Sequence, residues 1–194
     1  MTKVYKRRPR NAAATRAAIL ASARRAFARA GYDGAGVREI ARGAGVTAML
    51  VNRYFGSKER LFAEVVASIM AAPTILSQAN LESGRRGEAF ARALVELSAA
   101  GATPLDGFRI MLHSASSKPA ARIGRAQIER HYQKTLAAAL RGDFAAERAA
   151  LVLALVAGFQ VMRQMIGLSA LAEAEPRDLI ELLTPLFQRL VEER

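Results

Sequence analysis

Apolar residues recur every three or four positions along most of the chain, which is the spacing that places side chains on one face of an α-helix. The first such segment is expected to begin at a cap on Thr15 and to end at Gly31, where a short turn follows. A second, short helix is expected to end at the turn Gly43 to Gly45. Cap-forming residues stand where the next three helices should begin: Gly36, Thr47 and Ser57.

The remainder of the chain predicts a body of longer helices. Pro73 should end or bend the fourth helix, and Pro185 should kink the last one. No segment alternates long enough to require a strand, and no period of about 20 to 50 residues repeats. The sequence therefore predicts an all-α fold. The expected body helices cover residues 89–99, 104–114, 119–140, 145–167 and 176–192.

The second and third helices have the composition of a helix-turn-helix, which is two short helices joined by a glycine-containing turn. Ala41 is small enough for the helices to cross closely, and Gly45 permits a positive φ in the turn. Val51 is placed to pack the second helix of the pair onto the first. The small core between them is expected to contain Ile40, Ala44 and Val46.

Charge is concentrated around this motif. The whole chain carries a net charge of +12, yet residues 1–60 alone hold 14 Lys and Arg against 3 Asp and Glu. Residues 61–194 hold 15 basic and 14 acidic residues, so they are close to neutral. This asymmetry indicates a polyanion partner for the N-terminal segment, although a solubilising basic face would have the same composition.

With Val51 facing inward, the helical period defines an outward face on the third helix. Asn can form a bidentate pair with adenine, Arg can pair with guanine, and Ala or Met can contact the thymine methyl group. Tyr54, Lys58 and Arg38 are positioned for phosphate oxygens, and Arg38 also for a base. The expected outward face contains Thr47, Ala48, Met49, Asn52 and Arg53.

In this region the sequence resembles the tetracycline-repressor (TetR) family of bacterial transcription regulators. The resemblance covers about residues 15–66 and is most specific in RYFGSKERL, which follows the third helix. Asn52 stands where the family often has Tyr, which favours a base contact there. The family's DNA-contacting positions correspond here to Arg38, Thr47, Ala48, Met49, Asn52, Arg53, Tyr54 and Lys58.

The resemblance implies an N-terminal three-helix helix-turn-helix domain and a C-terminal helical domain that binds a ligand and dimerises. We therefore expect a flexible basic arm over 1–14, the DNA-binding domain over 15–58, and the second domain over 59–194. The segment 145–167 is apolar on nearly every side, so it needs a cover beyond its own core. The family places a homodimer interface on 145–167 and 176–192.

The body is expected to hold an unidentified small-molecule effector. Apolar side chains suited either to a pocket or to plain core packing are Phe90, Phe108, Met111, Met162 and Met165. His113 and His131 stand without cysteine or clustered carboxylates, so no metal site and no cofactor are expected. The motifs of a serine hydrolase, a P-loop enzyme and a zinc protease do not occur, so no catalytic activity is expected either.

The expected function is a sequence-specific, ligand-responsive repressor that binds a palindromic operator as a dimer, in the cytoplasm and away from membranes. The lack of cysteine fits a reducing compartment, and no signal-peptide core follows the basic N-terminus. Arg7, Arg8 and Arg10 are candidates for DNA contacts by the arm. Two alternatives remain: an architectural protein that coats DNA without sequence preference, and a helical enzyme with an incidental basic tail.

Overall fold

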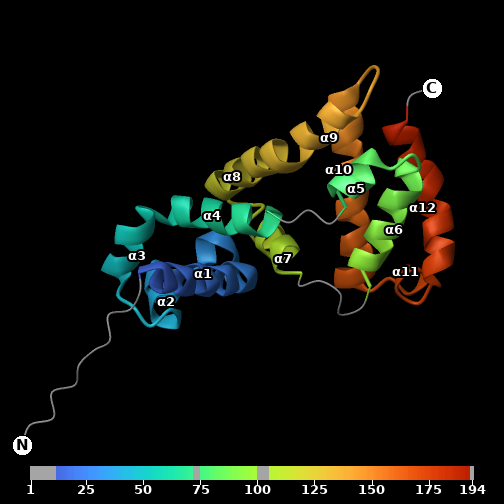
Figure 1. Cartoon of the computed structure of the whole chain (residues 1–194). Coiled ribbons are helices and arrows are strands. Elements are labelled where there is room, and N and C mark those ends of the chain that lie inside the picture. Colours follow the sequence, from blue (N-terminus) through green and yellow to red (C-terminus); the bar gives the residue numbers. More distant parts are fainter. Residues whose placement is uncertain (1–11, 72–74, 100–104, 193–194) are drawn as a thin grey trace, which may run out of the picture. The chain divides into compact units, whose positions relative to one another are not determined.

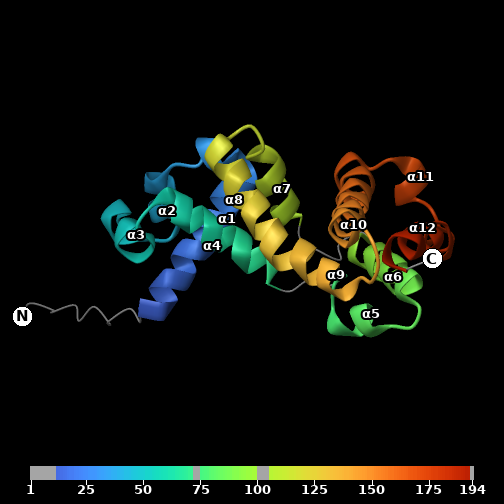
Figure 2. The same cartoon turned by 90° about the horizontal axis from the view of Figure 1, so that it is seen from above.

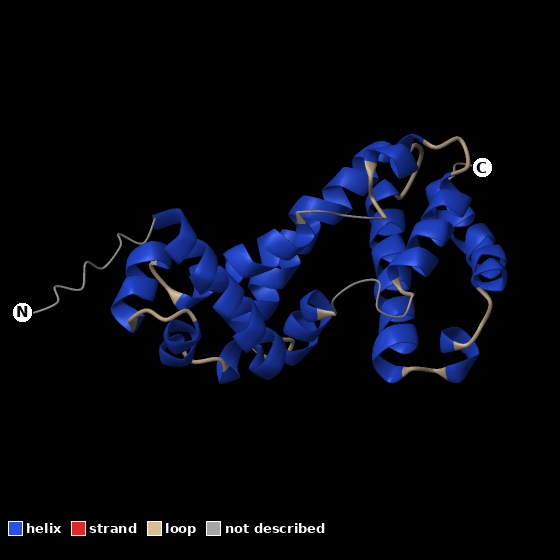
Figure 3. Ribbon diagram, turned by 60° about the horizontal axis from the view of Figure 1, so that its bottom comes forward, coloured by secondary structure: helices blue, strands red, loops and turns tan. Residues whose placement is uncertain are grey.

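The structure is a computed structural model that describes residues 12–71, 75–99 and 105–192. The described residues form helices and loops, with no strand among them, which confirms the all-α prediction (Figure 3). Pro73 and the arm residues Arg7, Arg8 and Arg10 lie outside the described ranges.

The chain forms two compact units. The first combines residues 1–65 with 109–121, and the second combines 66–108 with 122–194. The unit boundaries fall inside three helices: α4 (Lys58–Met70), α7 (Asp106–His113) and α8 (Lys118–Ile128) (Figure 1). A stretch from the second half of the chain is thus part of the N-terminal unit.

The first unit is built on α1 (Ala12–Gly34), α2 (Val37–Gly43) and α3 (Ala48–Phe55), together with the start of α4 (Figure 2). Its core contains an aromatic cluster. The ring of Phe62 lies edge-on to Phe27 at 5.0 Å and to Tyr32 at 5.1 Å between centroids. Because Phe27 and Phe62 are fully buried, this cluster fixes α4 against α1.

Two of the predicted N-terminal caps, Thr47 and Ser57, are confirmed by side-chain hydrogen bonds. Thr47 caps α3 by accepting a hydrogen bond from the Leu50 amide, and Ser57 accepts one from the Arg60 amide at 3.1 Å. Gly36 occupies the cap position of α2 without a side-chain bond. The prediction for Thr15 was wrong: α1 already includes Ala12, a strong helix former, so Thr15 lies buried inside the helix.

The end of α1 is fastened by residues that follow α7. Gly31 has φ 65° and ψ −174°, which interrupts helical geometry at the predicted stop. Just beyond it, the Tyr32 amide donates to Ser114 Oγ at 2.9 Å, and Ser117 Oγ donates to the Asp33 carboxylate at 3.1 Å. These bonds make the segment after α7 a structural part of the first unit.

The second unit has a hydrophobic core of its own. Its core is centred on Phe90 and Phe187, which are both fully buried and meet edge to face at 6.0 Å. Two turns of π-helix, η1 and η2, lie in line with the predicted helices 119–140 and 145–167. The further elements are α5 (Gln78–Glu82), α6 (Arg86–Leu97), η1 (Glu129–Gln133), α9 (Lys134–Ala139), α10 (Ala145–Gln160), η2 (Val161–Ile166), α11 (Ser169–Ala172) and α12 (Pro176–Val191).

Helices α6 and α12 pack side by side along their lengths (Figure 1). Gly87 makes this possible, because a Cβ there would lie 2.8 Å from the backbone nitrogen of Gln188. Pro185, where the sequence predicts a kink, lies inside α12, and the helix continues past it to Val191. Pro176 stands at the first turn of α12, as predicted, where proline's missing N–H is not needed.

Arg163 is a buried cation in this unit. Its Nη1 donates to the Val95 carbonyl and to Ser98 Oγ, each at 2.9 Å, and its Nε donates to the Leu171 carbonyl at 3.0 Å. Burial lowers the pKa of the guanidinium below its usual value. Since Val95 and Ser98 lie at the C-terminal end of α6, the partial negative charge of that helix end compensates the buried cation.

Candidate nucleic-acid interface

The turn between α2 and α3 has a defined hydrogen-bond pattern. The Val46 amide donates to the Ala41 carbonyl at 2.9 Å, and the Gly45 amide donates to the Arg42 carbonyl at 3.0 Å. Gly45 has φ 65°, which is the left-handed conformation expected for it from the sequence. These two bonds form a Schellman motif, which ends α2 and sets the direction in which α3 leaves.

Helix α1 contacts α2 close to this turn. Ser22 Oγ donates to the Ile40 carbonyl at 2.8 Å inside the unit. A Cβ on Gly43 would lie 2.4 Å from Ser22 Oγ, so α1 and α2 approach too closely there for a larger residue. Ile40 and Ala41 are buried as predicted, whereas Ala44 and Val46, also predicted for this core, are only half-buried.

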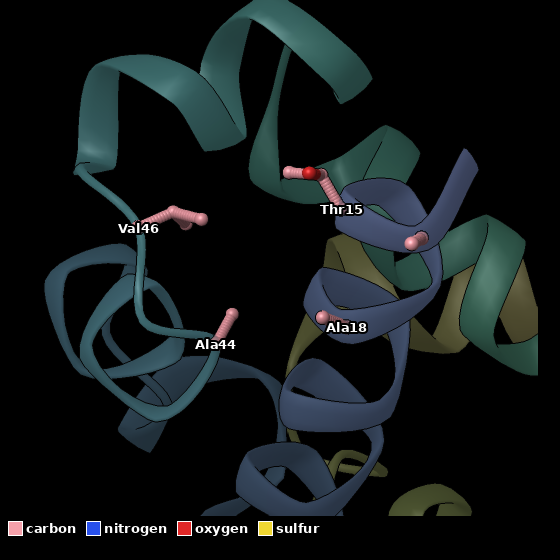
Figure 4. A pocket seen from close by; sticks show the side chains of 5 residues that line it. Thr15, Ala18, Ala44 and Val46 are labelled. Carbon is pink, nitrogen blue, oxygen red and sulfur yellow. The ribbon is translucent and has the colours of Figure 1, made fainter. Parts of the chain in front are cut away.

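A small hollow lies between the first turns of α1 and the helix-turn-helix. Figure 4 shows the side chains of Thr15 and Ala18 from α1 facing Ala44 and Val46 of the turn. Its volume is about 90 Å³, and Ala14 completes the lining. No charged group lines it, so it is a gap in the packing and offers nothing to a phosphate.

Helix α3 presents a polar face beside a buried one. Val51 and Phe55 are buried against the rest of the unit. Met49 is 82% exposed although it is apolar, and Asn52 and Arg53 are exposed next to it. The face predicted to read bases is therefore available to a partner, with Thr47 exposed and Ala48 half-buried at its start.

The basic side chains of this unit divide into paired and unpaired groups. Arg16 forms an ion pair with Glu64, and Arg29 forms one with Glu39. Among the described residues, no carboxylate pairs with Arg38 or Arg53, and both are exposed. Arg38 and Arg53 therefore leave positive charge on the helix-turn-helix that is available to a polyanion.

Lys58 has local partners in the structure. Its Nζ lies 4.6 Å from the centroid of the Tyr32 ring and 3.5 Å from the Asp33 carbonyl oxygen, near the end of α1. Burial, then the charges of Glu59 and Asp33, raise the pKa of the Tyr32 hydroxyl. Tyr54 is half-buried, with its ring 6.5 Å from that of Phe55. Lys58 and Tyr54 are thus half-buried, unlike the exposed Asn52 and Arg53.

The candidate effector residues do not share one environment. Phe90 is fully buried in the core of the second unit, and Met162 is 47% exposed. Phe108 and Met165 are half-buried in the second unit, while the half-buried Met111 belongs to the first. Among the described residues, no group of three or more His, Cys, Asp and Glu forms a metal site.

Two family models match the chain. The model described as bacterial regulatory proteins, tetR family, matches residues 19–65, which contain the helix-turn-helix. The model described as tetracyclin repressor-like, C-terminal domain, matches residues 85–191, which is more than half of the chain. The chain belongs to the TetR family. It is accordingly a DNA-binding transcriptional regulator, in a family of transcription factors and not of enzymes.

Solved structures of TetR-family and related regulators are similar along nearly the whole chain. A TetR-family regulator from Streptomyces coelicolor A3 is 27% identical, covers 96% of this chain and 99% of its own, and has a TM-score of 0.60. A transcriptional regulator from Rhodococcus sp. Rha1 is 26% identical over 90% and 95% of the two chains, with a TM-score of 0.62. AibR, solved with isovaleryl coenzyme A and operator DNA, is 19% identical over 89% and 97%, with a TM-score of 0.60. No curated protein matches the chain.

Proposed function

We propose that this TetR-family chain is a cytoplasmic, ligand-responsive repressor that binds a palindromic operator as a homodimer. The observation that carries the proposal is the exposed face of α3, where Met49, Asn52 and Arg53 project from a helix fixed by the Gly45 turn. A recognition helix reads base edges in the major groove, and two such helices in a dimer read half-sites about 34–36 Å apart.

Each exposed residue on α3 has a chemically defined target. Arg53 can donate two hydrogen bonds to guanine, Asn52 can exchange two with adenine, and Met49 suits a thymine methyl group. Thr47 and Ala48 begin the same face, and Arg38, Tyr54 and Lys58 are proposed to contact phosphates. For Lys58, this requires its ammonium to leave the carbonyl of Asp33, which is a weak contact at 3.5 Å.

Regulation is proposed to act through the body. AibR binds isovaleryl coenzyme A and operator DNA, which is one case of a similar fold holding both a small molecule and DNA. In this chain, residues 109–121 belong to the DNA-binding unit and continue directly into the second unit through α7 and α8. Phe108 and Met111 both lie on α7, so an effector that contacts either residue is proposed to shift this segment. Allosteric coupling of about 1–3 kcal/mol is typical.

The first test of the function is selection of genomic DNA fragments by the purified protein, followed by sequencing. The selection is made at about 150 mM salt, where fragments held by phosphate contacts alone bind the protein weakly. Enrichment of a short inverted repeat is the expected result, and the neighbouring genes would indicate the class of effector. Recovery of fragments without any shared sequence would instead assign the chain to the architectural proteins that bind DNA by its backbone.

Arg53→Ala should lower affinity for the selected operator by about 1–3 kcal/mol and relax the preference for one base pair, because a bidentate contact to guanine would be lost. The measurement is binding to the operator and to variants with each base pair changed. Arg25→Ala, an exposed arginine on α1, serves as the matched control and should leave the base preference unchanged. An equal loss on every sequence would show that Arg53 contacts a phosphate.

Removal of residues 1–10 should reduce the dependence of operator affinity on salt. If Arg7, Arg8 and Arg10 each neutralise a phosphate, the slope of log affinity against log salt falls by about 0.9 for each contact. Binding is measured across a series of salt concentrations for the full and the shortened chain. An unchanged slope would mean that the arm only adds solubility.

A further inference from the structure

Met49 is the most exposed methionine among the described residues. It is 82% exposed on α3, whereas Met162 is 47% exposed and Met70 only 7%. Met111 and Met165 are half-buried. The packing of the first unit therefore gives no reason for a large apolar side chain at position 49, and the thioether of Met49 is open to reagents in solution.

The composition of the chain leaves an oxidant few other targets. The chain contains no cysteine, no tryptophan and six methionines. Peroxides oxidise the methionine thioether to a sulfoxide, and exposed side chains react most readily. The methionines are therefore the side chains of this protein that are most easily oxidised. Met49 should react before the other methionines that the structure describes.

The reaction transfers one oxygen atom. The thioether sulfur attacks the terminal oxygen of a hydroperoxide, so a sulfur–oxygen bond forms and the peroxide O–O bond breaks. The sulfur loses two electrons and the peroxide gains them. The departing oxygen takes up a proton and leaves as water when hydrogen peroxide is the oxidant, or as an alcohol otherwise. The product is a polar, chiral side chain in place of a flexible apolar one.

The place of Met49 on α3 connects this change to the proposed base contacts. Asn52 and Arg53 follow Met49 by three and four residues and are exposed, so all three lie on one face of the helix. A sulfoxide oxygen placed against a thymine methyl group is a buried polar group without a partner, which is unfavourable. The same oxygen accepts hydrogen bonds, and the neighbouring guanidinium of Arg53 could donate to it instead of to guanine.

We propose that Met49 is a reversible oxidation site, and that its conversion to the sulfoxide by peroxide weakens operator binding. The inference rests on the proposed function, because it requires α3 to read the operator. It adds a form of regulation that acts on the recognition helix directly, without an effector in the second unit. Methionine sulfoxide reductases convert the sulfoxide back to the thioether, so the binding form of the protein is recovered.

Hydrogen peroxide is the probe for the first experiment. The oxygen gained by each methionine is measured by mass spectrometry of peptides, and operator affinity is measured on the same samples. Affinity should fall by about 10- to 100-fold, in proportion to the oxidised fraction of Met49 and with unchanged helical circular dichroism. Treatment with the reductases should restore the affinity. Unchanged affinity when Met49 is fully oxidised would overturn the proposal.

Substitutions separate the sulfur of Met49 from its apolar contact. Met49→Leu keeps an apolar side chain of similar volume, so it should bind the operator and keep its affinity in peroxide. Met70→Leu is the matched control, the same change at a buried position, and should remain sensitive to peroxide. Met49→Gln should bind weakly without any oxidant, because its side chain is polar. A peroxide-sensitive Met49→Leu, or a Met49→Gln that binds like the wild type, would contradict the proposal. If leucine itself weakens binding, recovery of the oxidised wild type by the reductases decides the question.

Operator DNA provides a second, independent test. If Met49 lies against bases in the complex, saturating operator should slow the oxidation of Met49 and leave that of Met162 unchanged. DNA of the same length without the operator sequence is the control. A reduced wild type that prefers no sequence would overturn the proposed function itself. A reduced wild type that binds the operator, yet has Met49 oxidised equally fast with and without it, would overturn the oxidation site alone.

Discussion

Gly31→Ala is expected to destabilise the DNA-binding unit by about 3–5 kcal/mol, which combines backbone strain with overpacking. At φ 65° and ψ −174°, Gly31 occupies a conformation that is almost exclusive to glycine. Its added Cβ would lie 2.2 Å from the carbonyl oxygen of His113, a backbone atom that cannot rotate away. Urea unfolding followed by circular dichroism measures the loss, and operator binding should weaken in parallel.

Gly36→Ser is the matched control for that variant. A Cβ at Gly36 meets nothing within 4 Å, and serine is preferred at the cap position that Gly36 occupies in α2. Its stability should equal or exceed that of the wild type. If Gly31→Ala were as stable as the control, the close contact between the end of α1 and His113 would not exist in solution.

Phe90→Ala should cost the second unit about 3–5 kcal/mol, the usual loss when a buried phenylalanine is truncated in a core. Phe90 is fully buried and packs edge to face against Phe187, so truncation removes both burial and an aromatic pair. Thermal unfolding of the full chain measures the effect. The same experiment decides whether Phe90 is core packing or part of an effector pocket.

Phe144→Ala, which removes the same atoms from the same unit, is the control. Phe144 is 73% exposed and has φ 56°, so its truncation should leave the free energy of unfolding within about 0.5 kcal/mol of the wild type. A stable Phe90→Ala that has lost only its response to an effector would contradict the core assignment and identify Phe90 as a ligand contact.

The sequence predicted most of the helix-turn-helix because its determinants are local. The Gly45 turn, the caps at Thr47 and Ser57, and the exposed face of Met49, Asn52 and Arg53 depend on residues within a few positions of each other. Thr15 was misassigned for a local reason too: the residues before it continue the helix as readily as those after it.

Other features depend on contacts that no local pattern reveals. The buried position of the Arg163 side chain depends on hydrogen bonds to the end of α6, more than 60 residues earlier in the chain. The short helices α5 and α11 have too few residues to show a period. Lys58 looked free for phosphate, yet its nearest partners, Tyr32 and Asp33, come from the end of α1.

The division of the first unit between residues 1–65 and 109–121 has a consequence for the protein's biosynthesis. The ribosome must add 56 residues after Val65 before Ala121 is made, which takes about 3 to 11 seconds at 5–20 residues per second. Until then, Ser114 and Ser117 are not available to fasten the end of α1. A nascent chain therefore carries its recognition helix for seconds before the unit that contains this helix is complete.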